Sequence, residues 1–357
     1  MRELIIDGKR IADDTAPWVV AELGHNPAGN LSLAKEMVLA ARDAGASAVK
    51  FQTRTPSEVY QANSKRGAYY YESDNPQWMH RVYGKHREAL EFNENQWREL
   101  FGFCRLYGIT AFSTPFDHKS ADLLQSMNVP AFKIASGDAT NIPLIEHVAA
   151  FGKPVIVSTG GCRWRNVCEV DLALLDKPHA LLQCSCIYPA PDDVMNLNVI
   201  QLYREEFPTT VIGLSTHNRS WHTSLAAYTL GARIIEHHFT TDKSLKGTDN
   251  HFSLNPAEMS ELVKACESVR QAMGSNQKHP DPREVAPTTE RRKSLVWANS
   301  LKAGRIVSRG DLTAKCPGDG IPPYEIGQFL GRQLAEPVQA EELVTWAQIA
   351  EKVYASR

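Results

Sequence analysis

Two lysines lie inside apolar segments of the sequence and are its first sign of chemistry. Lys50 stands within AVKFQ and Lys133 within AFKIAS. A lysine in an apolar strand must either find an anion or lose its charge. Two ammonium groups, together with hydroxyls and backbone N–H groups at helix starts, suit a phosphate plus a carboxylate. We therefore interpret both as anion-binding lysines, the alternatives being snorkelling side chains or structural ion pairs.

Two histidines form the second chemical signal. His217 follows the segment TVIGLS, and His238 lies near the end of ARIIEHHF. If the two segments are neighbouring strands, their imidazoles lie side by side and suit a divalent metal, although a lone histidine is more often a packed residue. Two protein nitrogens leave positions open for water and substrate, as in a Lewis-acid site. His237 alternates to the other face of its strand and should pack against outer helices.

These side chains must be positioned by eight short apolar segments that alternate with helical patterns. The segments are Trp18–Leu23, Ala46–Phe51, Ile109–Ser113, Ala131–Ala135, Pro154–Ser158, Ala180–Cys184, Thr210–Ser215 and Ala232–Phe239. Alternating strand and helix patterns predict repeated βα units and a parallel sheet. Eight such units in about 275 residues match a (β/α)₈ TIM barrel, and a doubly wound open sheet is the alternative.

Helix signals between these segments support the same reading. Asn30 can cap a helix that ends at Gly45, and Asn93 with Gln96 forms a variant of the capping box. The stretch Asn255-Pro256-Ala257-Glu258 opens another helix that ends near Gly274.

The active site of such a barrel lies at the carboxyl ends of its strands. Polar residues end nearly every predicted strand: Glu22, Lys50, Gln52, Ser113, Thr114, Lys133, Ser136, Ser158, Thr159, Gln183, Ser185, Ser215, His217, Glu236 and His238. A single Ser or Thr after a strand is usually a helix cap. Eight strand ends that converge on one place favour a shared site.

The amino-acid composition of the sequence changes after Gly274. Residues 275–293 are polar and Pro-rich, which predicts a linker between a catalytic domain, residues 1–274, and a second domain, residues 294–357. The second domain alternates short apolar pieces with Gly and Pro turns, so we expect a small β-rich module with little helix. It is near the lower size limit for independent stability, so contact with the barrel or a second chain is expected.

Composition restricts the possible partners. The chain is 43% hydrophobic and 22% charged, which is typical of globular proteins, and its formal net charge of −2 favours neither nucleic acid nor a membrane surface. No apolar run approaches the roughly 18 residues of a membrane helix, and the N-terminus does not resemble a secretory signal, so we expect a cytoplasmic protein. Seven cysteines without a C-x-x-C pair are interpreted as scattered buried thiols, although Cys184 and Cys186 share one strand face.

At these same residues the sequence resembles the sialic acid synthases and their legionaminic and pseudaminic relatives. The resemblance rests on AELGHNPAGN, DAGASAVKFQT, FSTPFD, VPAFKIASGDATNIPLI, GKPVIVSTGG, CIYPAP, IGLSTHN, IIEHHFT and KGTDNHFSL, in this order. The tail SLVWANSLKAGRIVSRGDLTAKCPGDGIPP is similar to the family's C-terminal antifreeze-like (SAF) domain, a β-clip fold.

The resemblance implies a metal-dependent condensation of phosphoenolpyruvate with the open-chain aldehyde of a sugar, such as N-acetylmannosamine or another N-acylhexosamine. By similarity, phosphoenolpyruvate is held by Lys50, Thr114, Lys133, Ser136, Ser158 and Ser215; the catalytic groups are Glu22, Lys50 and Glu236; the sugar site includes Gln52, Tyr188 and Asp249; and the metal ligands are His217 and His238. Manganese is the expected metal, with magnesium or cobalt as alternatives. The family also implies a domain-swapped homodimer.

Four departures from the family pattern leave the expected phosphoenolpyruvate and metal sites largely intact, although one of them, Cys186, stands at a position that contacts phosphoenolpyruvate in some members; together they bear on the identity of the sugar. The first loop reads Asn26-Pro27-Ala28-Gly29 and lacks the family's histidine, Cys186 replaces an asparagine of some members, Cys316 replaces an arginine, and Asn218 follows His217. The aromatic segment 62–86 is either a packed surface loop or a lid over the barrel mouth.

Two other functions are consistent with the residues. One is a Schiff-base aldolase with Lys133 or Lys50 as nucleophile. The other is an inactive carbohydrate-binding protein that keeps the fold.

Overall fold

The chain divides into two compact units, 1–274 and 275–357, of which the computed structural model describes residues 2–350. Residues 351–357, the end of the expected second domain, lie outside the described residues. No helix in the described part of the chain has the length and apolar character needed to cross a lipid bilayer.

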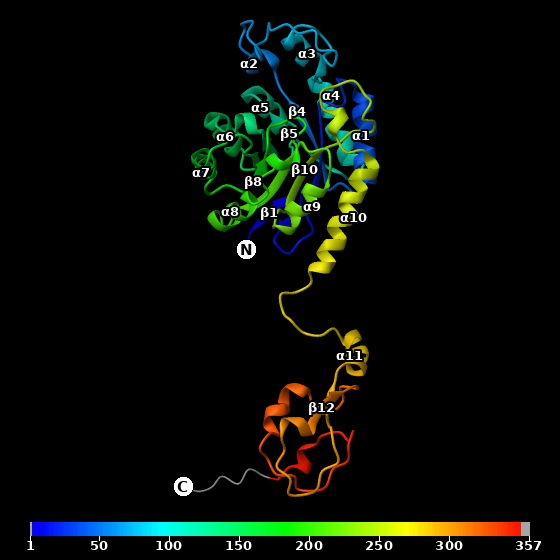
Figure 1. Ribbon diagram of the computed structural model, residues 1–357. Coiled ribbons are helices and arrows are strands. Elements are labelled where there is room, and N and C mark those ends of the chain that lie inside the picture. The colour runs from blue at the N-terminus through cyan, green and yellow to red at the C-terminus, as the bar shows by residue number, and fades with distance from the viewer. Residues whose placement is uncertain (1, 351–357) are drawn as a thin grey trace. The chain divides into compact units, whose positions relative to one another are not determined.

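The first unit is a closed barrel of eight parallel strands (Figure 1), which confirms the predicted fold. The strands are β3 (Trp18–Gly24), β4 (Ala48–Thr53), β5 (Thr110–Pro115), β6 (Phe132–Ile134), β7 (Val155–Ser158), β8 (His179–Cys184), β9 (Val211–Thr216) and β10 (Ile234–His238). Strand β10 pairs with both β9 and β3, so the sheet has no edge and the doubly wound alternative is wrong. Each predicted strand is present within two residues of its expected position.

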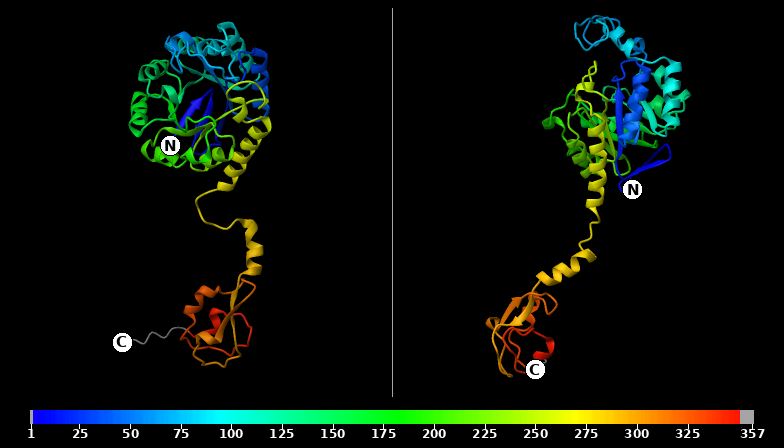
Figure 2. Two further views of the ribbon diagram at one scale, coloured as in Figure 1. Left: turned by 45° about the horizontal axis from the view of Figure 1, so that its top comes forward. Right: turned by 90° about the vertical axis from the view of Figure 1, so that its right-hand side faces the viewer.

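Helices surround the barrel, as the left view of Figure 2 shows. They are α1 (Leu31–Asp43), α2 (Pro56–Val59), α3 (Tyr83–Leu90), α4 (Glu94–Leu106), α5 (His118–Ser126), α6 (Ile142–Ala149), α7 (Trp164–Ala173), α8 (Val199–Glu206), α9 (His222–Thr229) and α10 (Pro256–Met273). The predicted capping box at Asn93 is formed, and the helix predicted to open at Asn255 is present and is itself capped by a capping box between Asn255 and Glu258. The apolar faces of the helices and the outward strand residues make one continuous core.

A hairpin that the sequence analysis did not predict precedes the barrel. Its strands β1 (Glu3–Ile6) and β2 (Lys9–Ala12) pair antiparallel. Leu4, Ile6 and Ile11 join the cluster of inward barrel residues that includes Trp18 and Phe112. The hairpin therefore closes the amino end of the barrel, opposite the end at which α2 and α3 lie (Figure 1).

The second unit has a small core of its own. Strands β11 (Ser294–Trp297) and β12 (Leu312–Lys315) pair antiparallel, and the other pairings are single bridges between loops. Short 3₁₀ turns, η5 (Arg309–Asp311), η6 (Pro323–Gln328) and η7 (Trp346–Gln348), complete it. Trp297 and Phe329 are buried at its centre. This is the β-rich, helix-poor module that the sequence predicts.

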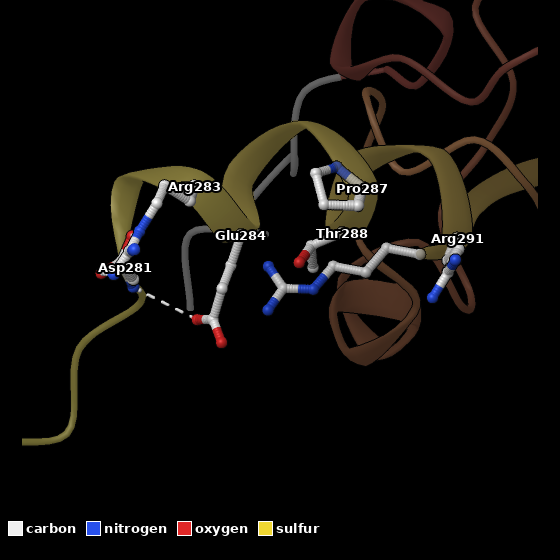
Figure 3. Close-up of a pocket in the computed structure, with 7 residues that line it drawn as sticks. Asp281, Arg283, Glu284, Pro287, Thr288 and Arg291 are labelled. Atoms are coloured by element: carbon white, nitrogen blue, oxygen red, sulfur yellow. Dashed lines mark hydrogen bonds and ion pairs between the residues drawn. The ribbon is translucent and has the colours of Figure 1, made fainter. Parts of the chain in front are cut away.

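The expected linker is more ordered than predicted. Residues 275–293 contain the turn η4 (Pro282–Glu284) and the helix α11 (Val285–Arg291). Neither element buries a residue, so no apolar period marked them in the sequence. Figure 3 shows a groove along them, lined by Asp281, Arg283, Glu284, Pro287, Thr288, Arg291 and Arg292. Arg283 is already paired with Asp281, and no imidazole or thiol lines this groove.

A glycine inside the barrel provides a test of the packing. A Cβ at Gly213 of β9 would lie 2.4 Å from the backbone oxygen of Ile234 and 2.4 Å from Leu182 Cδ2. We expect Gly213→Ala to lower the free energy of unfolding by about 2 kcal/mol, because neighbouring core atoms must move to make room for the added methyl group. Urea unfolding followed by circular dichroism measures this change.

The matched control is Gly102→Ala in α4, where the nearest atom to a new Cβ is 4.0 Å away. Since glycine weakens a helix interior, this variant should gain roughly 0.5–1 kcal/mol. Equal stability of the two variants would contradict the packing described for β9.

Candidate active site

A cavity of about 790 Å³ opens at the carboxyl ends of the barrel strands. Twelve of the thirteen predicted site residues line it: Lys50, Gln52, Thr114, Lys133, Ser136, Ser158, Tyr188, Ser215, His217, Glu236, His238 and Asp249. The thirteenth, Glu22, is buried beside the cavity and bonds to two of the lining residues, Lys50 and Gln52. The structure thus brings the whole predicted set together, while the roles of these residues stay predictions.

Strand alternation explains the convergence. Side chains point alternately inward and outward along each strand, so neighbouring strands deliver inward residues at similar heights. Glu22 pairs in register with Lys50 on one side and with His238 on the other. Glu236 pairs with Ser215 in the same way. Adjacent strands therefore place unlike charges and hydroxyls beside each other.

Lys50 is held by carboxylates. Its Nζ lies 2.8 Å from Glu22 Oε2 and 3.5 Å from Glu236 Oε1, and it donates to Thr114 Oγ1 at 3.0 Å. Burial acts to lower the pKa of Lys50, but the two carboxylates outweigh burial and raise the pKa above its usual value. Lys50 is therefore a permanent cation.

The ammonium group of Lys133 has different partners from that of Lys50. Its Nζ donates to Ser158 Oγ at 2.6 Å and to the carbonyl of Ile134 at 2.9 Å, and no ion pair of Lys133 is found between residues 2 and 350. Only 1% of this residue is exposed. Burial lowers the pKa of Lys133, and the charge of Glu236 offsets part of this effect. This ammonium group has hydrogen-bond acceptors but no bound counter-charge.

Glu236 links the lysines to the imidazole side of the cavity. Its Oε1 accepts a hydrogen bond from Ser215 Oγ at 3.1 Å. Burial would raise the pKa of Glu236, but the charges of Lys133 and Lys50 outweigh it, so the pKa is lowered. Glu236 is thus an ionised carboxylate inside a cavity that also holds two ammonium groups.

The two predicted metal ligands lie side by side, with ring centroids 5.3 Å apart. His217 Nδ1 is 2.9 Å from the carbonyl of Ser185, which can only accept, so Nδ1 carries the proton and Nε2 keeps its lone pair. Burial lowers the pKa of His217 to about 4. Nδ1 of His238 is buried without a hydrogen-bond partner, 3.9 Å from Asp249 Oδ2.

This donor set fits a divalent cation with an open coordination sphere. Across residues 2–350, no group of three or more His, Cys, Asp or Glu side chains is arranged to hold a metal. The protein could then supply two nitrogens, and water and substrate would complete the ligands. His237 is buried on the other face of β10, as predicted.

Strand β8 departs from the expected pattern. The prediction that the strand-end residues Gln183 and Ser185 point at the site is wrong, and so is the same prediction for Ser113 and Thr159, which bond instead to Thr53 and to Tyr203. Gln183 donates to the carbonyl of Met195 and Ser185 to that of Val194, both on the outer side. Alternation places Cys184 in the cavity instead. The expectation that the cysteines are all buried is also wrong, because Cys186 and Cys316 are exposed.

Several lining residues were missed by the sequence analysis. Among them are His25, Arg54, Tyr60 and Arg87. Arg54 directly follows β4, so extending the strand-end rule by one residue would have found it. Arg87 lies in α3 beyond a long loop and contacts His25 at 3.0 Å, a pairing that no sequence spacing indicates. Burial and the charges of Arg54 and Arg87 hold the pKa of His25 well below its usual value.

The aromatic segment 62–86 combines both expected roles. Trp78 stacks on His86 with centroids 5.3 Å apart and contacts Tyr71 and Tyr83, as in a packed loop. Arg66 and Tyr83 of the same segment line the cavity.

Two asparagines in the segments that depart from the family pattern make buried hydrogen bonds. Asn26 donates to the carbonyl of Phe239 and to Ser253 Oγ. Asn218 donates to Ala190 and Asp192, which anchors the loop after β8.

Comparison with known proteins identifies families and relatives that this chain matches. Residues 37–278 match the NeuB family, and residues 292–350 match the SAF domain. The chain is 33% identical to the human N-acetylneuraminate-9-phosphate synthase, over 94% of each chain. It is 36% identical to the N,N'-diacetyllegionaminic acid synthase of Campylobacter jejuni, over 91% of this chain and 98% of the relative.

Solved structures agree with the sequence matches. The N-acetylneuraminic acid synthetase of Leptospira borgpetersenii superimposes with a TM-score of 0.71 at 29% identity, covering 80% of this chain and 95% of that one. The family match includes seven of the eight barrel strands, and the relatives align over both units. The chain described here therefore belongs to the NeuB family and carries a C-terminal SAF domain.

Proposed function

We propose that this protein condenses phosphoenolpyruvate with the open-chain aldehyde of an N-acylhexosamine, producing a nonulosonic acid and inorganic phosphate. The observation that carries the proposal is the buried ammonium group of Lys133, which has no ion pair in the described chain and faces the same cavity as Lys50. A buried cation of this kind needs an anion. The names of the relatives support a substrate of this class.

Phosphoenolpyruvate carries two anionic groups, and the floor of the cavity offers partners for both. Lys133 and Lys50 supply charge, and the hydroxyls of Thr114, Ser136, Ser158 and Ser215 supply hydrogen bonds from four different loops or strands. Because these groups sit on a rigid barrel, they are held in place before the ligand arrives.

The reaction requires one new carbon–carbon bond and one broken carbon–oxygen bond. The enol carbon of phosphoenolpyruvate attacks the aldehyde carbon, whose oxygen becomes an alkoxide and takes a proton. Water adds to the second carbon of the former phosphoenolpyruvate, and phosphate leaves as the carbonyl forms. Glu22 or Glu236 can accept the proton of this water, since both carboxylates lie within hydrogen-bond or ion-pair reach of Lys50.

We also propose that the reaction depends on a divalent metal bound by His217 and His238, manganese foremost, with magnesium or cobalt as alternatives. Such an ion, when bound, polarises the aldehyde and stabilises its developing negative charge. The fixed tautomer of His217 and the unpartnered Nδ1 of His238 support this assignment.

The acceptor sugar is assigned to the outer part of the cavity. Gln52, Tyr188 and Asp249 line the cavity, and the Tyr188 ring lies against His217 with centroids 3.9 Å apart and the two planes tilted by 39°. Their amide, phenol and carboxylate groups suit sugar hydroxyls. N-acetylmannosamine or a related N-acylhexosamine is the proposed acceptor.

A domain-swapped homodimer is the proposed assembly. The second unit has a small core and exposes large apolar side chains, among them Tyr324 at 82%, Ile306 and Trp346. A module of this size that exposes such residues is expected to be covered by a partner.

The reaction itself is the first test. We expect phosphate release from phosphoenolpyruvate only when manganese and an N-acylhexosamine are both present, with mass spectrometry identifying the sugar acid. An acceptor screen that compares neutral hexosamines with their 6-phosphates would identify the sugar.

Chelation should abolish the release, and added manganese should restore it. Binding of manganese to the protein alone, followed by electron paramagnetic resonance, provides a readout that does not depend on the acceptor. No release with any aldose, despite bound manganese and phosphoenolpyruvate, would leave the carbohydrate-binding protein as the better description.

Lys133→Met tests the proposed anion site. Removing a buried charge that binds the substrate should lower kcat/KM for phosphoenolpyruvate by about 100-fold. This factor corresponds to a loss of ~2.7 kcal/mol of transition-state stabilisation. Steady-state kinetics measure this change. The matched control is Lys153→Met, because Lys153 lies before β7, at the other end of that strand from Ser158, and bonds to Asn128.

The Schiff-base alternative predicts a different result, and the lowered pKa of Lys133 is the observation that favours it. Borohydride treatment with pyruvate should leave the wild-type lysines unmodified. A pyruvyl adduct on Lys133, with activity that resists chelation, would replace the proposed condensation by an aldolase reaction.

The proposed assembly predicts a molecular mass of twice the chain mass of 39.8 kDa by size-exclusion chromatography with light scattering. Trp346→Ser in the second unit should shift the protein toward monomer and lower activity together, because an exposed apolar contact would be lost. A monomeric, fully active wild-type protein would contradict the dimer.

A further inference from the structure

Two thiols meet at the carboxyl end of β8. Cys184 is the last residue of the strand and is buried, whereas Cys186 is exposed two residues later. A Cβ built on Gly160 would lie 2.5 Å from Cys186 Sγ and 3.3 Å from Cys184 Sγ, so both sulfurs converge on the same point. Ser136 Oγ lies there too, 2.9 Å from the N–H of Gly160.

The hydrogen bonds make the two sulfurs unequal. Hydrogen bonds from Cys184 and Ser136, with the charge of Lys133, outweigh burial and lower the pKa of Cys186 to about 6. The pKa of Cys184 is raised well above its usual value, first by its hydrogen bond to Cys186 and then by burial. Cys186 is therefore a thiolate at neutral pH, with a protonated thiol beside it.

Small molecules have a route to this pair that does not pass through the main cavity. A second cavity of about 510 Å³ lies among the residues that follow β7 and β8 and those of α7 and α8. Cys184 and Cys186 both line it, and Cys184 also lines the main cavity. The pair thus forms part of the wall between the two cavities.

We propose that Cys184 and Cys186 are a modification site, a dithiol that a peroxide oxidises to an intramolecular disulfide beside Ser136. The Cys186 thiolate attacks one peroxide oxygen, the O–O bond breaks, and a sulfenic acid and hydroxide form, the hydroxide taking from the solvent the proton that Cys186 had released and leaving as water. Cys184 then attacks the sulfenic sulfur, the S–S bond forms, and the oxygen leaves as water with the proton of Cys184. Overall, two thiols and hydrogen peroxide give one disulfide and two waters.

Backbone geometry permits this bond. Two residues of extended chain separate their Cα atoms by about 6.6–6.8 Å, which is the upper end of the range for disulfides. Cys186 lies beyond the end of β8, and any departure from full extension brings the Cα atoms closer.

The other cysteines are poorer candidates. Burial raises the pKa of both Cys104 and Cys266 to about 12, so neither is a thiolate at neutral pH. Cys162 lines the second cavity and is the alternative partner for Cys186, but burial raises its pKa and it lies outside the hydrogen-bonded pair.

Oxidation should reach the proposed substrate site through Ser136. This hydroxyl accepts a hydrogen bond from the N–H of Gly160 and lies beside both thiols, and it is one of the proposed phosphoenolpyruvate contacts. Pulling the sulfurs together removes its partners and shifts the wall it belongs to. We expect the affinity for phosphoenolpyruvate to fall about tenfold, as for a lost hydrogen bond to an anion. This consequence rests on the proposed function, whereas the disulfide itself does not.

The experiment treats the full-length protein with one equivalent of hydrogen peroxide. Intact-mass spectrometry should show a loss of two hydrogen atoms, and peptide mapping should join Cys184 to Cys186. Dithiothreitol should reverse the change. Titration calorimetry with phosphoenolpyruvate before and after oxidation measures the tenfold loss independently of any acceptor sugar.

Two variants make the result decisive. Cys184→Ala should lose the disulfide and carry oxygen on Cys186 instead, whereas Cys162→Ser should still form the disulfide, with thermal unfolding used to check that both are folded. A Cys162–Cys186 bond, or a stable sulfonic acid at Cys186 in the wild type, would refute the pair. If the disulfide forms but neither oxidised nor reduced protein binds phosphoenolpyruvate, the proposed function fails and the modification site stands.

Discussion

Two ammonium groups buried at one end of a barrel determine how the rest of this site is built. Lys50 is compensated within the protein by Glu22 and Glu236, so it stays charged without a ligand. Lys133 has only a hydroxyl and a carbonyl as partners. A low-dielectric cavity makes such an arrangement costly until an anion enters. The same cost therefore disfavours the empty site and favours a doubly anionic substrate.

Closure of the barrel makes this arrangement possible. Because β10 pairs with both β3 and β9, the residues at either end of the chain's eight-strand series become neighbours. Glu22 from the first barrel strand thus lies in register with His238 from the last. The hairpin of β1 and β2 closes the other end with apolar side chains. Charged side chains are gathered inside the barrel at its carboxyl end, whereas apolar side chains fill its interior at the amino end.

One strand contributes differently from its neighbours. Where the others present lysine, carboxylate, imidazole or hydroxyl, β8 presents a thiol at Cys184, followed by Cys186. The thiols share a hydrogen-bonding partner, Ser136, with the backbone of Gly160. Under the two proposals above, sulfur at this position couples a redox-sensitive group to the proposed anion-binding wall, since oxidation would change contacts within that wall. Oxidation of the thiols would therefore also affect the chemistry of the site.

The sequence by itself determined the eight strands, the helix caps at Asn93 and Asn255, and the residues of the site, because period, capping and strand-end position are local properties. It did not determine the partners of Arg87 or the hairpin that closes the barrel. Those depend on contacts between segments far apart in the chain, which carry no local signal. Only closure of the barrel decided which side chains share one cavity, because closure makes neighbours of strands that the sequence keeps apart.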